Sequence, residues 1–253
     1  MESDALLTLA MDIGEEMLLS GAEIHRVEDA MSRICRAYHC QRIDVFSITS
    51  VLMATLVDGE GKAYTETRRI NRSGTDLNKL HRLNCLSRTL CASTPEIPLA
   101  RAEFEKALRE SGKPRAVFLG FAYLIVAGSF TLLFGGTLLE AAVSAVIAVI
   151  LFFVVRLSEH ISVNPILAKI AFTFFFSILA ILSSRLFPSV SPDQIIIGNI
   201  MLVIPGVGLT NSIRDLFSGD LISGLLRLSE ALIMAVAIAA GYVLAGFVMG
   251  GVA

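Results

Sequence analysis

The chain has 253 residues, of which 54% are hydrophobic, and its formal net charge at pH 7 is −2. Its mean hydropathy of +0.69 exceeds that of ordinary soluble domains, and the lack of a basic surplus argues against a nucleic-acid partner. Residues 1–115 hold 16 of the 21 Lys and Arg and 17 of the 23 Asp and Glu. We therefore expect a cytosolic domain over residues 1–115 and a transmembrane domain over residues 116–253.

Residues 1–115 show the periodicities of a small α+β domain. Apolar residues at three- and four-residue spacing predict two helices that Gly21 separates. A segment rich in Val, Ile, Thr and Ser predicts a strand. The turn signal Asp58–Gly61 follows it and predicts a second strand that runs back beside the first. Met1–Ala10 has no basic segment, so no cleavable signal peptide is expected. The expected helices cover 5–20, 22–38, 76–91 and 98–111, and the expected strands cover 43–58 and 62–70.

No catalytic constellation stands out in this domain, and we predict that the protein is not an enzyme. The sequence has no Walker loop, no GxSxG and no HExxH, so ATP-driven transport within this chain is unsupported. The second helix carries a charged motif, Glu23, Arg26 and Glu28, around His25. Acid–base work by His25 is one interpretation, and a solvated histidine among surface charges is the preferred one.

All four cysteines lie in the first domain and should be reduced thiols if that domain is cytosolic. A zinc site could be drawn from His39, Cys40, His81 and Cys85, because His81 and Cys85 are one helical turn apart. No CxxC or HxxxH pair supports it. Buried or idle thiols are the preferred interpretation, and we expect neither a metal nor a cofactor.

Five apolar segments follow in series, joined by short polar links. Each is about long enough to cross a hydrocarbon layer of ~30 Å as a helix. A buried soluble core would not account for five such runs in succession. The fold class expected is therefore an α-helical bundle of about five transmembrane helices after a small α+β domain. The spans are expected near 116–134, 137–155, 166–187, 194–209 and 225–249.

The basic residues of the links predict the orientation. If the spans alternate, all but one of these residues fall on the side of the amino-terminal domain, and only Arg185 falls opposite. The positive-inside rule then places the amino terminus in the cytosol and the carboxy terminus outside, in a multi-pass protein of the inner membrane. The residues on the cytosolic side are Arg109, Lys113, Arg115, Arg156, Lys169, Arg214 and Arg227.

Two acids lie in or beside the spans. Glu140 falls in the first turn of the second span, where the helix dipole favours an acid. Glu230 lies deeper in the fifth span, one turn after Arg227. A local ion pair with Arg227 and a proton or substrate site are both open interpretations of Glu230.

The fourth span carries the strongest local signal. Pro205 lacks an N–H, and Gly206 and Gly208 add backbone freedom beside it. Unwound backbone at membrane depth must be satisfied by protein or by a water-filled cavity, and such breaks often form the central site of secondary transporters. A proline kink used for packing is the plainer alternative. Side chains that could add hydrogen bonds or charges here are Asn199, Thr210, Asn211, Arg214, Asp215 and Asp220.

Two motifs carry a family resemblance. They are Ser20–Asp29, which reads SGAEIHRVED, and Pro205–Asp215, which reads PGVGLTNSIRD and precedes Gly219-Asp220. Together they resemble the threonine/serine exporter family of the ThrE and YjjP type, over nearly the whole chain. The resemblance implies export of threonine, serine or a dicarboxylate such as succinate. The shorter members are thought to act with a YjjB-like small membrane protein that supplies a second half, which implies an oligomeric assembly.

The leading hypothesis is a subunit of a secondary transporter, driven by an ion gradient, with its solute site at the broken fourth helix. A membrane-anchored sensor or scaffold whose cytosolic domain is the working part is the alternative. An intramembrane hydrolase lacks a base at span depth, because His160 lies in a link. Predicted solute-binding residues are Asn199, Pro205, Gly206, Gly208, Thr210, Asn211 and Arg214; predicted ion-coupling residues are Asp215, Asp220 and Glu230.

Overall fold

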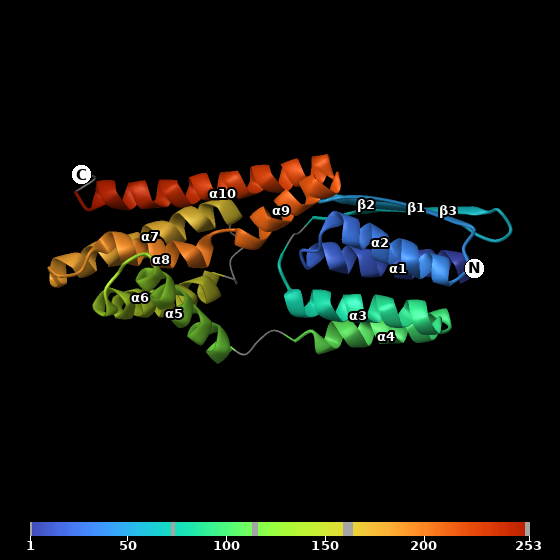
Figure 1. The fold of residues 1–253 in the computed structure, drawn as a ribbon, viewed down its shortest axis with the longest axis horizontal. Helices are drawn as coiled ribbons and strands as arrows, with labels where there is room; N and C mark the ends of the chain where they lie inside the picture. Colours follow the sequence, from blue (N-terminus) through green and yellow to red (C-terminus); the bar gives the residue numbers. More distant parts are fainter. Residues whose placement is uncertain (1, 72–73, 113–115, 159–163, 251–253) are drawn as a thin grey trace. The chain divides into compact units, whose positions relative to one another are not determined.

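The computed structural model describes residues 2–71, 74–112, 116–158 and 164–250 (Figure 1). The chain falls into two compact units. Unit 1 comprises Met1–Gly112 and Val207–Ser229, and unit 2 comprises Lys113–Gly206 and Glu230–Ala253. Unit 1 therefore holds a segment from the predicted membrane domain, residues 207–229, together with the predicted amino-terminal domain.

Unit 1 is an α+β structure built around a three-stranded antiparallel meander of order β1-β2-β3. The register pairs Ile48 with Val51, so Thr49 and Ser50 form a two-residue hairpin turn. The elements are α1 (Glu2–Leu19), α2 (Ile24–Ala37), β1 (Arg42–Ile48), β2 (Val51–Val57), β3 (Ala63–Arg69), α3 (Leu77–Ser93), α4 (Ile97–Glu110), α9 (Gly206–Ser218, in unit 1 from Val207) and the start of α10 (Leu221–Val248).

The single strand expected over residues 43–58 is wrong, because two strands occupy this segment. Two-residue hairpin turns are usually recognised in a sequence by Asn-Gly or Asp-Gly. Thr49-Ser50 has neither and is itself compatible with a strand, so nothing local marks the reversal. The four expected helices of this domain are confirmed, with their ends shifted by up to three residues.

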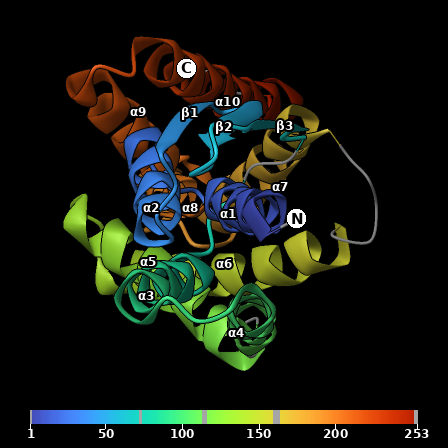
Figure 2. The same ribbon diagram turned by 90° about the vertical axis from the view of Figure 1, so that its right-hand side faces the viewer.

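The core of unit 1 lies between three layers: the sheet, the α1–α2 pair, and the α3–α4 pair (Figures 1 and 2). Because α1 lies in the middle layer, nearly all of its apolar side chains are buried, while its acidic residues Asp12 and Glu15 pair with Arg68 of β3. Leu52, Ala54 and Leu56 alternate along β2 and turn inward, whereas Phe46 and Met53 on the other face are exposed. The sheet therefore buries one face only.

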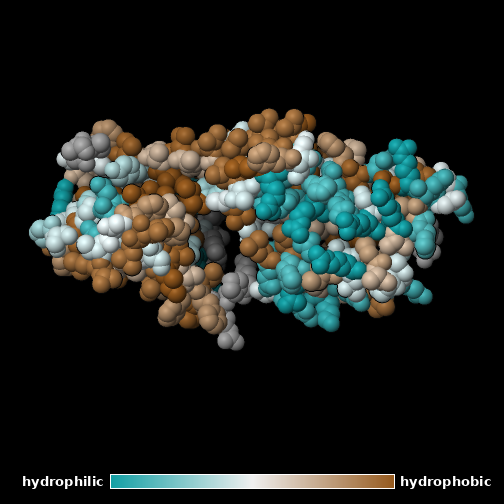
Figure 3. Space-filling view, in the orientation of Figure 1, coloured by the Kyte–Doolittle hydropathy of each residue, from teal (hydrophilic) through white to brown (hydrophobic). Residues whose placement is uncertain are grey.

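Unit 2 is a helical bundle whose outer surface is apolar. It contains α5 (Ala116–Leu133), α6 (Leu138–Ser158), α7 (Pro165–Leu186), α8 (Pro192–Val203) and α10 from Glu230. Large side chains such as Phe118, Phe153 and Phe247 are more than 60% exposed, and Figure 3 shows hydrophobic residues covering much of these helices. Soluble surfaces rarely carry so continuous an apolar area, so this surface suits lipid.

Four described helices, α5, α6, α7 and α10, are long and apolar enough to cross a membrane. The fourth predicted span is instead two helices, because α8 and α9 are bent by 59° at the break between them. The pair passes the same test together, so the described part of the chain holds four candidate spans, or up to five. The predicted break at Pro205 is confirmed as an interruption of the helix.

Small residues bring the helices of unit 2 close together. A Cβ on Gly198 would lie 2.1 Å from Thr131 Oγ1, and one on Gly241 would lie 2.5 Å from the Ile170 carbonyl oxygen. No side chain could be added at either place without moving backbone or helix. Helices in lipid pack through close contacts at small residues, because burial of apolar side chains contributes little to helix association there. These contacts fix α8 against α5, and α10 against α7.

Candidate functional site

The interruption between α8 and α9 follows from its sequence. Ile204 precedes a proline and is extended, with φ −67° and ψ 137°, because the proline ring crowds a helical neighbour. Pro205 has no N–H to donate to the turn before it. The chain resumes a helix at Gly206. Ile204 N still donates to the Ile200 carbonyl oxygen at 3.0 Å, but Pro205 supplies no N–H for the next carbonyl group of α8, that of Met201.

A carbonyl group at the end of α8 is capped by a lysine. Lys169 Nζ donates to the Val203 carbonyl oxygen at 2.7 Å, within unit 2. The half-buried ammonium group thus lies at the negative end of the α8 dipole. Lys169 was predicted only as an orientation signal. A lysine at the fifth position of an apolar helix is costly unless it has a hydrogen-bond partner. That cost could have indicated from the sequence that Lys169 binds a polar group.

Asn199 links α8 to α6 inside the bundle. Its side chain is fully buried, and its Nδ2 donates to Ser144 Oγ and to the Ile195 carbonyl oxygen, both at 2.9 Å. Its Oδ1 is buried and has no hydrogen-bond partner. A buried amide oxygen without a donor is costly in an apolar interior. Of the predicted solute-binding residues, Asn199, Pro205 and Gly206 belong to unit 2.

A polar stripe on α7 runs inward from the capping lysine. Thr173 and Ser177 follow Lys169 at intervals of four residues, so the three share one face of the helix. Both hydroxyl groups are fully buried, and neither has a hydrogen-bond partner among the described residues. Buried Ser and Thr in apolar helices usually bond a carbonyl one turn back. No local signal in the sequence sets these two residues apart.

Glu140 has a structural role. It is buried, and its Oε2 accepts from Thr137 N at 2.6 Å while the Thr137 hydroxyl accepts from the Glu140 N–H at 3.3 Å. This is a capping box at the start of α6. Its Oε1 accepts from Ser191 N at 2.6 Å, just before α8. The interpretation of Glu140 as a helix-start acid fits these bonds.

A second polar cluster lies in unit 1, where Asp215 of α9 caps α2. Asp215 is 1% exposed, and its Oδ1 accepts from the Ile24 N–H at 3.3 Å. The N-cap residue of α2, Glu23, makes no side-chain capping bond of its own. A carboxylate from a distant helix therefore satisfies one of the free donors at this positive helix end.

Three further side chains join α9 and α10 to the same turn. Asn211 Nδ2 donates to the Gly21 carbonyl oxygen at 2.9 Å, and Arg214 pairs with Glu23. Arg227 donates to the Ala22 carbonyl oxygen at 2.7 Å and lies 3.4 Å from Asp215 Oδ2. The two motifs that carried the family resemblance thus contact each other. This set, Asn211, Arg214, Asp215 and Arg227 with Gly21–Ile24, is called the junction below.

The turn of the junction depends on Gly21. Its φ is +86°, and an added Cβ would lie 2.7 Å from the Gly74 carbonyl oxygen. Only glycine takes this conformation readily, and only glycine fits here. The tight turn brings the carbonyl groups of Gly21 and Ala22 to Asn211 and Arg227.

The remaining predicted residues are more scattered. Gly208 and Thr210 lie on α9, Asp220 follows it, and Glu230 is an exposed residue of α10 in unit 2. Arg227 pairs with Asp215, so the local pair with Glu230 is not its role. Exposed Arg26 lies 4.0 Å from Glu23.

Glu28, the last residue of the charged motif on α2, has a raised pKa. Burial raises it, and the hydrogen bonds that Ser47 N and Oγ donate to the carboxyl group lower it by a smaller amount.

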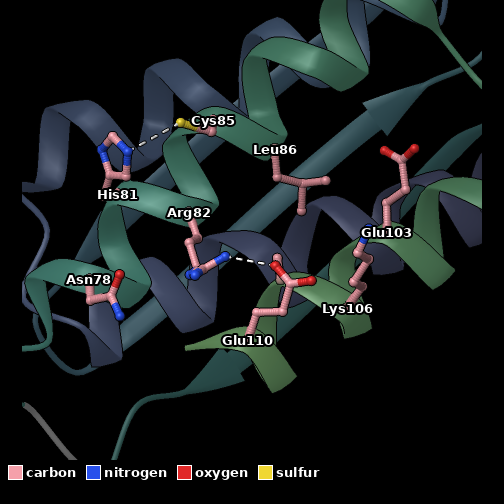
Figure 4. Close-up of a pocket in the computed structure, with 9 residues that line it drawn as sticks. Asn78, His81, Arg82, Cys85, Leu86, Glu103, Lys106 and Glu110 are labelled. Atoms are coloured by element: carbon pink, nitrogen blue, oxygen red, sulfur yellow. Dashed lines mark hydrogen bonds and ion pairs between the residues drawn. The ribbon is translucent and has the colours of Figure 1, made fainter. Parts of the chain in front are cut away.

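A groove of about 430 Å³ lies between α3 and α4 (Figure 4). Arg82 pairs with Glu110 across it at 2.7 Å, and Cys85 Sγ lies 3.7 Å from His81 Nε2. His81 and Cys85 are the only residues of the hypothetical zinc set in this groove, and the described residues contain no group of three His, Cys, Asp or Glu that could hold a metal. Burial, with lesser effects of Cys40 and Cys91, raises the pKa of Cys35 to about 12.

Comparison with known proteins gives matches over nearly all of the chain. The ThrE family model, described as "Putative threonine/serine exporter", matches residues 8–249. A "Probable threonine/serine exporter" of Mycobacterium tuberculosis is 23% identical over 238 residues, which are 93% of this chain but 45% of that protein. A "Probable succinate transporter subunit YjjP" of Klebsiella aerogenes is 25% identical over 250 residues, 96% of this chain and 94% of that protein. No solved structure was found to match.

Proposed function

Because this chain belongs to the threonine/serine exporter family, we propose that it is a subunit of a secondary transporter that exports a small metabolite. The solute is an amino acid such as threonine or serine, or a dicarboxylate such as succinate, as the names of the two relatives suggest. The candidate spans fit a multi-pass membrane protein.

The observation that carries the proposal is the interrupted helix in an otherwise apolar bundle. The Val203 carbonyl group at the interrupted end of α8, the cationic lysine that donates to it and the buried amide of Asn199 gather polar groups where lipid would exclude them. Lys169 uses one N–H on Val203 and keeps two for a solute carboxylate. A kink used only for packing would not need a charged cap.

The predicted residues divide between two roles in this proposal. Asn199, Pro205 and Gly206, with Lys169, belong to the solute site. Asn211 and Arg214 have their side chains engaged in the junction of unit 1, and we assign them to holding α9 on the amino-terminal domain. The sequence has no phosphate-binding loop, so an ion gradient is the proposed energy source. Asp215, which is buried, is a better proton carrier than the exposed Glu230.

A second membrane subunit is part of the proposal. The chain spans about half the length of the mycobacterial relative. It covers nearly all of the relative whose name describes a transporter subunit. A separate YjjB-like membrane protein would supply the other half. Co-purification of this chain with such a partner tests the assembly, and a chain that exports solute alone would contradict it.

We propose that the protein lies in the inner membrane with its amino terminus in the cytosol, because the basic residues of the links fall on the side of the amino terminus. Exposed Cys85 reports on it. A membrane-impermeant maleimide should label Cys85 only after the cells are made permeable. Labelling of Cys85 in intact cells would place the amino-terminal domain outside.

Solute efflux from loaded proteoliposomes containing the chain and its partner tests the function. Wild type should release threonine, serine or succinate faster than empty vesicles, and Lys169→Gln should lower the rate at least tenfold. Arg156→Gln, which changes an exposed basic residue at the end of α6, is the control and should have little effect. Wild-type vesicles that release none of the three solutes would refute the proposal.

A further inference from the structure

Unit 2 contains four buried side-chain oxygen atoms for which the described residues provide no hydrogen-bond partner: Gln194 Oε1, Asn199 Oδ1, Thr173 Oγ1 and Ser177 Oγ. The side chains of the three residues Asn199, Thr173 and Ser177 are fully buried, whereas that of Gln194 is partly exposed. Each unpaired buried group lowers stability, and native proteins rarely keep several in one place without a use. Their surroundings are apolar helices, so neither solvent nor backbone explains them.

The three residues lie at adjoining levels of the bundle. Helices α7 and α8 are joined by the short segment 187–191, as antiparallel neighbours are. The contact of Lys169 with Val203 sets their register. For two antiparallel helices in this register, the rise of about 1.5 Å per residue predicts that Thr173 lies level with Asn199, and that Ser177, one turn further, lies level with Ile195. Phe176 and Ile195 share one core cluster, which agrees with this register.

The chemistry of the stripe changes along its length. Lys169 supplies a cation at the half-buried end. About 6 Å further along, one helical turn, Thr173 offers a hydroxyl and Asn199 offers a carbonyl oxygen. Both hydrogens of the Asn199 amide are used on Ser144 and Ile195, so its free atom can only accept. The stripe therefore suits a carboxylate at one end and a hydrogen-bond donor at the other.

We propose that Thr173 and Ser177 of α7, with Asn199 Oδ1 of α8, bind the polar groups of a solute whose carboxylate is held by Lys169. This inference rests on the proposed transport function and refines its site. The fitting ligand has one carboxylate and an ammonium or hydroxyl group that donates to Asn199. A second carboxylate would meet an acceptor there, with no second cation among the residues of this stripe.

Thermal unfolding of the full-length chain purified in complex with its partner subunit, with and without L-threonine, L-serine or succinate, tests the site. Thr173→Val conserves volume and removes the unpaired oxygen, so the solute-free melting temperature should stay the same or rise. The rise in melting temperature caused by threonine or serine should fall, corresponding to at least fivefold weaker binding. Ser177→Ala should act in the same direction. Ser183→Ala on the same helix is the control, because its hydroxyl bonds Ala180 O.

The outcomes separate this site from the general function. If wild type responds to threonine or serine and Thr173→Val and Ser177→Ala respond equally, the site is wrong while the transport proposal stands. A Thr173→Val variant that melts lower without solute, yet shows the full solute response, would mean that its hydroxyl serves the fold. A stronger response to succinate than to threonine would also overturn the site. If no solute shifts wild type, both proposals fail.

Discussion

At the scale of single residues, several charged side chains of the described structure form ion pairs that join one element to another. Arg68 illustrates this, because it contacts the carboxylates of Asp12, Glu15 and Glu66 between α1 and β3. Burial lowers the pKa of Arg68, but the hydrogen bonds that its guanidinium group donates to these carboxylates outweigh burial and raise the pKa. Such residues fix the helix against the sheet edge and offer no free group for chemistry.

Glu28 gives a pH dependence with a definite sign. Burial raises the pKa of its carboxyl group in the fold, so the folded state binds a proton more tightly than the unfolded chain. The stability contributed by Glu28 is then present below the ordinary pKa and is lost as pH rises through the raised pKa. Glu28→Gln keeps an acceptor for Ser47 but does not titrate. Its free energy of unfolding relative to that of wild type should therefore increase when the pH is raised from 4 to 7.

Denaturant unfolding of wild type and Glu28→Gln at both pH values measures this difference. Glu105→Gln, at an exposed position of α4, is the matched control. A difference between Glu28→Gln and wild type that does not change with pH would contradict the assignment.

The sequence could predict residues only where the signal is local. Pro205 and its glycines predicted the interruption of the helix, and the position of Glu140 in the first turn of a span indicated a helix-start acid. Lys169 could not be placed on Val203, and Asp215 could not be placed on Ile24 191 residues away, because both contacts exist only after folding. Thr173 and Ser177 read as ordinary small residues of a membrane helix until their lack of partners was visible.

At the scale of elements, the helices were predicted well because each has a strong period or a long apolar run. The strands were predicted less well, since the turn at Thr49-Ser50 has no signature. The allocation of α9 to the amino-terminal unit was not predicted. Its sequence continues a membrane span, and only the junction contacts show that one side of it packs on the amino-terminal unit.

The junction predicts that α2 depends on α9. Asp215→Ala removes the acceptor from the Ile24 N–H and leaves Arg227, which is only 12% exposed, without its carboxylate. We expect a loss of about 1–3 kcal/mol of stability. Hydrogen exchange of the first-turn amides of α2, Ile24 to Val27, should speed up correspondingly.

Arg214→Ala is the matched control for the junction. Its guanidinium group is 57% exposed, so its pair with Glu23 should contribute only about 0.2–1 kcal/mol. First-turn exchange that is equally fast in the two variants, or unchanged in Asp215→Ala, would show that Asp215 does not cap α2.

At the scale of the whole molecule, the chain is a multi-pass membrane protein of an exporter family. The boundary between its two compact units falls at Gly206, which is also the first residue of α9. The interrupted helix therefore marks both a gap in backbone hydrogen bonding and a division of the structure. A solute site at such a gap uses groups that a continuous helix would have satisfied internally.

The role of Lys169 in solute binding can be measured by equilibrium binding of radiolabelled L-threonine, L-serine and succinate to the chain purified with its partner, as wild type, Lys169→Gln and Lys169→Arg. We expect saturable binding of a carboxylate solute to wild type, a loss of at least tenfold in affinity for Lys169→Gln, and recovery to within about threefold of wild type for Lys169→Arg. Binding to Lys169→Gln that equals wild type would contradict the claim that the lysine at the end of α8 holds the solute.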